Sequence, residues 1–211
     1  MVRDQDRTAE WPVVGSAEEL RALYPEPRGR ALRKVIDHLD DHCRRFIELC
    51  PFCVLSSASP TGEPEISPRG GEPGFASVLD EETLLIPDRP GNNRLDNFRN
   101  LTSNPAVALL FLVPGLDETL RVYGQAHILR REALPPAMSA DGKTRTGLRV
   151  DVGRVHFQCP KALMRARLWH EDVRVERSRF PTLGQILAAQ TGDTNPPESQ
   201  SAMVRRYRDL L

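Results

Sequence analysis

The sequence lacks any surplus of charge. Lys+Arg and Asp+Glu number 29 each in 211 residues, so the formal net charge is zero and no overall field attracts a polyanion. Nucleic-acid binding is therefore not expected. Uninterrupted apolar runs near the roughly 18 residues that a membrane helix needs are also missing, and charges stand where a signal peptide would have its apolar segment. These absences predict a cytoplasmic protein with no membrane partner.

Cysteine is scarce and clustered. The four cysteines are too few for a secreted disulfide scaffold and are expected to remain thiols. Cys50 and Cys53 have the spacing of a redox dithiol, which requires a thiolate stabilised at a helix N-terminus. Here the predicted helix ends at Cys50 instead of beginning after it. Two small buried apolar residues are therefore the favoured interpretation of this pair.

Recognisable catalytic and metal motifs are also missing. The chain has no P-loop, no GxGxxG and no nucleophile elbow. His38 and His42 have an i, i+4 spacing that suits zinc, but neighbouring aspartates favour a solvated helix face, so no metal is predicted. His127, His156 and His170 are candidate proton donors for which structural roles are more common. No catalytic residue is assigned.

Apolar spacing predicts helices near both ends of the chain. Ser16 to Tyr24 is a short helix that Ser16 caps, and Arg30 to Cys50 carries a longer apolar stripe at helical spacing. Further helices are expected at Pro160 to Leu168, Thr182 to Gln190 and Ser199 to Leu211.

The middle of the chain is predicted to form strands joined mostly by tight turns. One helix, Asn92 to Ser103, interrupts them, and residues 142–147 are expected to be a loose polar loop. This order predicts a mainly β (α+β) fold, an antiparallel sheet or small barrel with helices around it. The strands are expected at Phe52 to Ser57, Glu63 to Ser67, Phe75 to Leu79, Thr83 to Ile86, Ala106 to Val113, Thr119 to Leu129 and Leu148 to Phe157.

The junction LLIPDRPGNNRLDNFRNL, from Leu84 to Leu101, carries the strongest sign of a binding site. A strand that leads into a helix N-terminus presents free backbone N–H groups, and arginines beside it add charge. Side-chain donors come from Arg89, Asn92, Asn93 and Arg94. A plain helix cap at Asn92 with solvated arginines explains the spacing equally well.

A second basic segment lies upstream, in EISPRGG. Ser67 and Arg69 share a face if the strand continues, because side chains alternate along a strand. A hydroxyl and a guanidinium could then converge on one group. The alternative is a strand end that dissolves into a loop.

Together, three segments resemble the pyridoxamine 5′-phosphate oxidase-like family of FMN-binding split barrels. They are PFCVLSSASPTGEPEISPRGGEPGF, LLIPDRPGNNRLDNFRNLTSNPAVALLFLVPG and ETLRVYGQAHI. The chain is most similar to the uncharacterised flavin-nucleotide-binding branch with SPRG and IPDRPGNNR segments. The resemblance spans Phe52 to Trp169, and HFQCPKALMRARLW is also similar to that branch.

The resemblance implies a six-stranded antiparallel split β-barrel that forms a homodimer, with FMN in grooves at the subunit interface. The chain is then expected to be a single domain, 1–211. A helical N-terminal segment would cover 1–50, the barrel 52–169 and a helical C-terminal extension 170–211.

The resemblance also implies roles for individual residues. The FMN phosphate would be held by Ser67, Arg69, Asn93 and Arg94, with Asn92 at the start of the helix. Ring contacts would come from Ile86, Pro87 and Asp88. Either Arg121 or Gln125 would face the groove, and Lys161, Arg165 and Trp169 would close it from the same subunit or its partner.

The implied activity is that of an FMN-dependent oxidoreductase acting on an unknown small molecule. Two departures argue against pyridoxamine phosphate oxidation itself: Pro68 and the two glycines after Arg69 are expected to break the strand, and the C-terminal Arg and His pattern of those oxidases is not found. A noncatalytic flavin carrier, or a split barrel that binds haem or a deazaflavin, are the alternatives.

Overall fold

The computed structural model describes residues 11–208. The chain divides into two compact units, Met1–Ile36 and Asp37–Leu211. The first unit contains α1 (Ala17–Ala22), which Ser16 caps as expected, and α2 (Arg30–Arg33). Residues 1–10 of the stretch considered for a signal peptide, and residues 209–211 of the expected last helix, lie outside the described residues.

The prediction of one long helix from Arg30 to Cys50 is wrong. Only its second half continues as a regular helix, α3 (Asp41–Leu49), which buries Cys43, Phe46 and Ile47. Asp40 begins this helix anew, because its Oδ1 accepts a hydrogen bond from the backbone N–H of Cys43 at 2.8 Å. An aspartate favours such a cap over a helix interior. Leu32, from the expected stripe, is instead 59% exposed.

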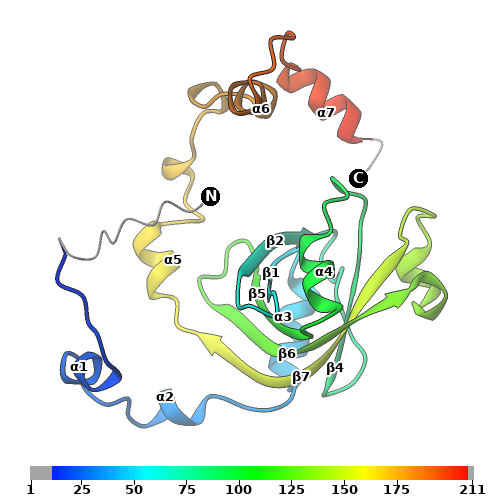
Figure 1. Ribbon diagram of the computed structural model, residues 1–211. Coiled ribbons are helices and arrows are strands. Elements are labelled where there is room, and N and C mark those ends of the chain that lie inside the picture. The colour runs from blue at the N-terminus through cyan, green and yellow to red at the C-terminus, as the bar shows by residue number, and fades with distance from the viewer. Residues whose placement is uncertain (1–10, 209–211) are drawn as a thin grey trace. The chain divides into compact units, whose positions relative to one another are not determined.

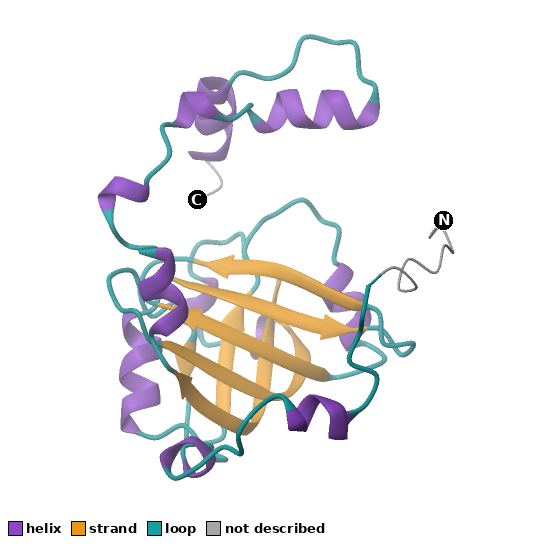
Figure 2. Cartoon of the chain, turned by 90° about the vertical axis from the view of Figure 1, so that its left-hand side faces the viewer, coloured by secondary structure: helices purple, strands orange, loops and turns teal. Residues whose placement is uncertain are grey.

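The central part of the chain folds into an antiparallel split barrel of seven strands. Its order is β2-β1-β5-β6-β7-β4-β3, one strand more than the six that the family resemblance implies, and the count includes a β3 of only two residues. Figure 2 shows two sets of strands that cross each other. The strands are β1 (Phe52–Ala58), β2 (Pro64–Gly70), β3 (Ser77–Val78), β4 (Thr83–Pro87), β5 (Ala106–Leu112), β6 (Thr119–Arg130) and β7 (Thr146–Gln158).

Strand β2 continues through the segment that was expected to break it. Pro68 pairs with Val54, and Gly70 pairs with Phe52. Because β2 is an edge strand, the missing N–H of Pro68 can face the open side without losing a ladder hydrogen bond. This continuation keeps Ser67 and Arg69 on one face of the strand.

The long strands β6 and β7 bend at a bulge beside Gly124. A Cβ atom on Gly124 would lie 2.0 Å from the carbonyl oxygen of Asp151, so only glycine fits there. The barrel interior is packed mainly with aliphatic side chains, together with Phe111. Its fully buried members include Leu55, Leu109, Phe111, Leu120, Val122, Val150 and Val155.

The helix in the junction is shorter than the expected Asn92 to Ser103. It is α4 (Asp96–Leu101), and it packs beside β1, β2 and β6 (Figure 1). Asn93 and Leu95 both have φ 59°, a left-handed conformation that interrupts the helix on its N-terminal side. Asn92 does not cap the helix. Its Oδ1 accepts a hydrogen bond from the N–H of Arg94 at 3.1 Å within the turn.

Residues 131–145, between β6 and β7, form a segment here named the β6–β7 arm. It contains the 3₁₀ turns η2 (Arg131–Ala133) and η3 (Pro136–Ser139). Leu134 and Met138 pack against Leu85. Within residues 142–147, which were expected to be a loose polar loop, Thr144 is fully buried, and Thr146 and Gly147 already belong to β7.

Among the described residues, three α-helices follow the barrel: α5 (Lys161–Ala166), α6 (Leu183–Thr191) and α7 (Gln200–Arg208). The 3₁₀ turns η4 (Glu171–Val173) and η5 (Arg177–Arg179) lie between α5 and α6. Thr182 and Gln185 form a reciprocal capping box at the start of α6. Within residues 11–208, no helix has the length and apolar character needed to cross a membrane.

Candidate functional site

Three chain segments that are distant in sequence line one groove of about 1030 Å³. They are β2 from Glu65 to Arg69, the junction from Asp88 to Asn97, and the β6–β7 arm through Arg131, Gly142, Lys143 and Arg145. The two segments that the sequence marked as candidates therefore meet at one place. A smaller cavity of about 400 Å³ lies among residues 177–200 and includes none of the candidates.

The groove is positively charged although the chain as a whole is neutral. Its lining carries six basic side chains and three acidic ones, a surplus of three positive charges. The basic residues are Arg69, Arg89, Arg94, Arg131, Lys143 and Arg145, and the acidic residues are Glu65, Asp88 and Asp96. Such a lining favours an anionic ligand.

Arg69 is held firmly and still has an unused donor. Its Nη1 donates to Oδ1 of Asp88 at 3.1 Å, and its Cζ lies 5.3 Å from the centre of the Phe98 ring. The Nε atom is buried and has no hydrogen-bond partner among the described residues. A buried donor without an acceptor is costly, so this guanidinium is suited to one more acceptor.

Asp88 is fixed at the same end of the groove. Its backbone N–H donates to the carbonyl oxygen of Thr146 at 2.9 Å. Burial raises the pKa of the Asp88 carboxyl, and the nearby charge of Arg69 opposes that rise. The carboxyl therefore lies between a low-dielectric environment that favours its neutral form and a cation that favours its anion.

Ser67 belongs to a buried polar network. Its Oγ donates to Oδ1 of Asn97 at 2.5 Å, and Nδ2 of Asn97 donates to Oγ of Ser57 at 2.9 Å and to the carbonyl of Glu65 at 3.3 Å. Asn97 is 3% exposed. The network joins α4 to β1 and β2, and it commits the Ser67 proton to Asn97, so Ser67 offers a ligand only its oxygen.

Arg94 is the most open of the predicted phosphate residues. Its side chain is 74% exposed, and its Nε donates to Oδ2 of Asp96 at 2.7 Å. That hydrogen bond raises the pKa of Arg94. Asn93, beside it, also lines the groove.

Arg89 connects the junction to the β6–β7 arm. Its Nη1 forms an ion pair with Asp141 and lies 3.4 Å from Oγ1 of Thr144. The pKa of Asp141 is lowered to about 2, chiefly by the hydrogen bond from the backbone of Thr144, with Lys143 and Arg89 adding to the effect. Arg89 thus stabilises the wall of the groove.

The arm supplies residues that sequence reasoning missed. Arg131 donates to the carbonyls of Gly142 and Ser139, both at 3.1 Å, and so closes the arm on itself. Arg145 is exposed, lines the groove, and makes no hydrogen bond or ion pair within the described part of the chain. The clustered charges in DGKTR were the available signal.

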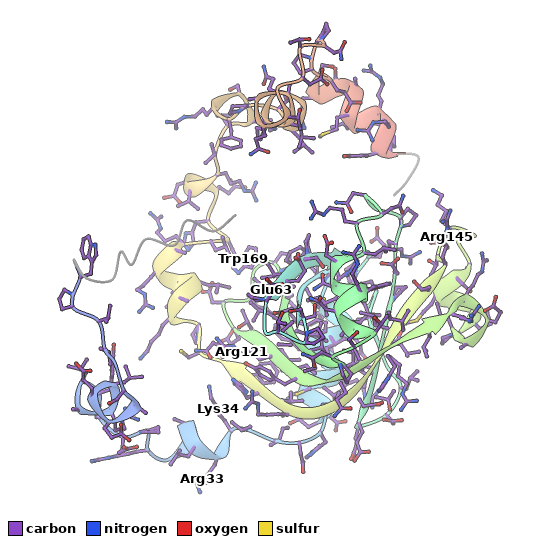
Figure 3. All side chains as sticks on the ribbon, viewed as in Figure 1. Arg33, Lys34, Glu63, Arg121, Arg145 and Trp169 are labelled. Atoms are coloured by element: carbon purple, nitrogen blue, oxygen red, sulfur yellow. The ribbon has the colours of Figure 1, made fainter. Side chains whose placement is uncertain are left out.

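Several predicted residues do not reach this groove within one subunit. Ile86 and Pro87 are buried in β4. Arg121 and Gln125 lie on the outer face of β6, and Nε1 of Trp169 donates to the carbonyl of Leu116 at 2.8 Å. Figure 3 shows Arg121 and Trp169 on the opposite side of the barrel from Arg145. Lys161 and Arg165 lie on α5 near Trp169 in sequence and are not part of the groove lining either.

The Cys50 and Cys53 thiols are buried and unpaired by any disulfide. Cys50 Sγ contacts the carbonyls of Phe52 and Leu112 at 2.9 and 3.1 Å. Burial raises the pKa of Cys53 to about 12. Such thiols are inert at neutral pH. Across residues 11–208, no group of three or more His, Cys, Asp or Glu side chains could hold a metal ion.

The fold is that of a split barrel, and its groove has a cationic lining. The family model described as pyridoxamine 5′-phosphate oxidase matches residues 39–162, more than half of the chain. The chain therefore belongs to the pyridoxamine 5′-phosphate oxidase family.

Solved structures with a similar fold have low sequence identity. HupZ from Group A Streptococcus is 16% identical, with a TM-score of 0.45, over 55% of this chain and 90% of that one. A general stress protein 26-related protein from Clostridium acetobutylicum is 13% identical, with a TM-score of 0.40, over 56% and 85%. An FMN-binding protein from Syntrophomonas wolfei is 12% identical, with a TM-score of 0.40, over 55% and 88%. No curated protein matches the chain.

Proposed function

We propose that this protein binds FMN and acts as an FMN-dependent oxidoreductase on a small molecule. The observation that carries the proposal is the guanidinium of Arg69, which lies in a groove with a positive surplus and has a buried N–H without an acceptor. A phosphate monoester offers three acceptor oxygens and nearly two negative charges, so it suits both features. Family membership supports the same ligand.

The donor set fits the phosphate through side chains. Arg69 and Arg94 supply charge and forked hydrogen bonds, and Asn93 adds an amide donor. Ser67 also lines the groove, but its hydroxyl would donate to the phosphate only after turning away from Asn97. The helix start contributes less than the sequence indicated, because α4 has only six residues and no side-chain cap. Bound FMN would supply the electron transfer. The residues of this chain bind the phosphate, orient the ring and exclude water.

We propose that the site is completed in a homodimer. The outer face of β1, β2 and β5 is largely apolar, with the cross-strand pairs Val54–Pro68 and Val54–Leu110 at its centre. Ile66 and Pro68 also line the groove, so the groove borders this face. A second subunit seated there could bring Arg121, Gln125, Lys161 and Trp169 to the flavin.

An absorption spectrum of the purified protein tests the ligand. Two flavin bands, with FMN released on denaturation, support the proposal, whereas a Soret band or a deazaflavin spectrum would replace FMN by another cofactor. Steady reduction of bound flavin by a nicotinamide donor, with turnover on an acceptor, supports an enzyme. A flavin that is bound but never turns over indicates a carrier.

The phosphate site is tested by Arg69→Ala combined with Arg94→Ala. Each charge-assisted contact is worth roughly 1.5–3 kcal/mol, so the double variant should lose most FMN affinity in a fluorescence titration. Arg99→Ala with Arg149→Ala is the matched control, since it removes two arginines outside the groove lining. Equal FMN affinity in both double variants would contradict the assignment.

A further inference from the structure

Arg69 and Asp88 form the least exposed ion pair of the groove. Their side chains are 22% and 21% exposed, whereas those of Arg94 and Asp96 are 74% and 27% exposed. Only one hydrogen bond joins Arg69 to Asp88, at 3.1 Å, although a guanidinium and a carboxylate can form two. The Nε of Arg69 is left without an acceptor. Asp88 therefore pairs with the charge of Arg69 but leaves the Nε–H donor of Arg69 without an acceptor.

This arrangement has a consequence for any anion that approaches Arg69. An ionised Asp88 already neutralises the guanidinium, so the second anion meets a carboxylate in the same place. Two anions that share one site raise the pKa of at least one of them. A protonated Asp88 would relieve the repulsion and would add an O–H donor directed at the ligand.

We propose that Asp88 couples the binding of an anion at Arg69 to the uptake of one proton. The anion replaces the carboxylate at the guanidinium, and Asp88 takes a proton from solvent and donates it in a hydrogen bond to the anion. Asp88 thereby determines ligand specificity, because only an anion strong enough to displace it is retained. This deepens the proposed function, on which it depends only for the identity of the anion.

The groove lining offers three carboxyl groups that could take up such a proton: Asp88, Glu65 and Asp96. None of the described residues that line the groove is a histidine. Burial favours the neutral form of Asp88 before any ligand binds, and Arg69 opposes it. The other charged groups facing the groove are Glu65 on β2, Arg89, Arg94 and Asp96 in the junction and α4, and Arg131, Lys143 and Arg145 on the arm.

Calorimetric titration of the wild-type protein tests the coupling without any substitution. Inorganic sulfate is the first probe, since it carries no proton near neutral pH, and FMN is the second. Titrations in two buffers that differ in ionisation enthalpy measure the protons taken up for each anion bound. The expected result is net proton uptake and an affinity that weakens as the pH rises. Binding of both probes without proton uptake would overturn the proposal.

The Asp88→Asn variant tests whether Asp88 is the residue that takes up the proton when the anion binds. The amide keeps an acceptor for Arg69 but removes the charge, so the variant should bind either probe roughly tenfold more tightly at mildly alkaline pH, equivalent to about one pKa unit. Its binding should no longer take up a proton. Asp96→Asn is the matched control, because it removes an equal charge that lies in the same groove beside the exposed Arg94. An equal gain in both variants, or weaker binding by Asp88→Asn, contradicts a specific role for Asp88.

The outcomes separate this proposal from the proposed function. Sulfate binding with proton uptake but no FMN binding would support the role of Asp88 and refute the flavin. FMN binding with no proton uptake would support the proposed function and refute the role of Asp88. A thermal melt of each variant checks that it is folded.

Discussion

At the scale of single residues, Asn97 fixes the wall of the groove. Its amide joins Ser67 on β2 to Ser57 on β1, and it is almost fully buried. A buried network of this kind is stable only while each member has a partner.

Asn97→Leu tests that network. The substitution keeps the volume but removes the partner of the Ser67 hydroxyl and the donor to the Glu65 carbonyl, and it leaves Ser57 only the hydrogen bond from Asn100 at 3.2 Å. The free energy of unfolding should therefore fall by about 2–3 kcal/mol in urea titrations. Asn92→Ala is the control, because Asn92 is exposed and accepts one hydrogen bond from Arg94. It should cost less than about 1 kcal/mol. An Asn97→Leu protein as stable as the control variant would show that the network contributes little.

The sequence predicted the residues that line the groove better than it predicted the residues that hydrogen-bond to them. Ser67, Arg69, Asp88 and Arg94 all line it. The partner Asn97 was missed although its spacing from Leu101 is i, i+4, which places it on the buried face of α4. Polar residues on an apolar helix face are easily assigned to solvent when the hydroxyls they meet come from distant strands.

At the scale of elements, the strands were predicted closely and the helix boundaries less well. Strand positions follow from local alternation and turns, whereas the start of α4 depends on the left-handed conformations of Asn93 and Leu95. A leucine at φ 59° is unusual and has no signal in the sequence. The continuation of β2 through Pro68 was equally hidden, because it depends on β2 being an edge strand.

The attachment of the β6–β7 arm can be tested through Asp141. Its pKa is about 2, below the ordinary carboxyl value of 3.8. The ionised form therefore stabilises the folded state, fully at pH values above the ordinary value, and that contribution is lost as the pH falls through about 2.

Asp141→Asn should lower the free energy of unfolding by roughly 1 kcal/mol at neutral pH, a modest value because the partner Arg89 is 41% exposed and solvent screens the pair. The difference from wild type, measured by urea unfolding at several pH values, should shrink toward pH 2. Asp193→Asn is the control, since Asp193 accepts a similar turn hydrogen bond from Asn195. A difference that grows on acidification would contradict this role of Asp141.

At the scale of the whole molecule, the fold class followed from the order of strands and turns and from three matching segments. The division of the chain after Ile36 could not be predicted from the sequence, because the apolar stripe expected from Arg30 to Cys50 continues across it. The groove includes only part of the predicted site, since Arg121 and Gln125 lie on the outer face of β6. The sequence does not indicate which of these residues would reach the groove of a second copy.

The proposed homodimer can be tested by a substitution at the centre of its expected interface. Val54 lies at the centre of the outer apolar face, paired with Pro68 on one side and Leu110 on the other. Val54→Glu would place a charge where a second copy is expected to pack, and an unpaired buried charge costs several kcal/mol. Light scattering after size exclusion should therefore report a monomer.

The same variant should lose FMN affinity although Val54 does not line the groove. The loss should exceed tenfold if the second subunit supplies contacts to the flavin, since one lost contact to a charged group is worth about 1.5–3 kcal/mol. Leu79→Glu is the control, because Leu79 is 53% exposed and lies outside the paired strands of this face. A Val54→Glu monomer that binds FMN as tightly as wild type would place the whole flavin site within one subunit.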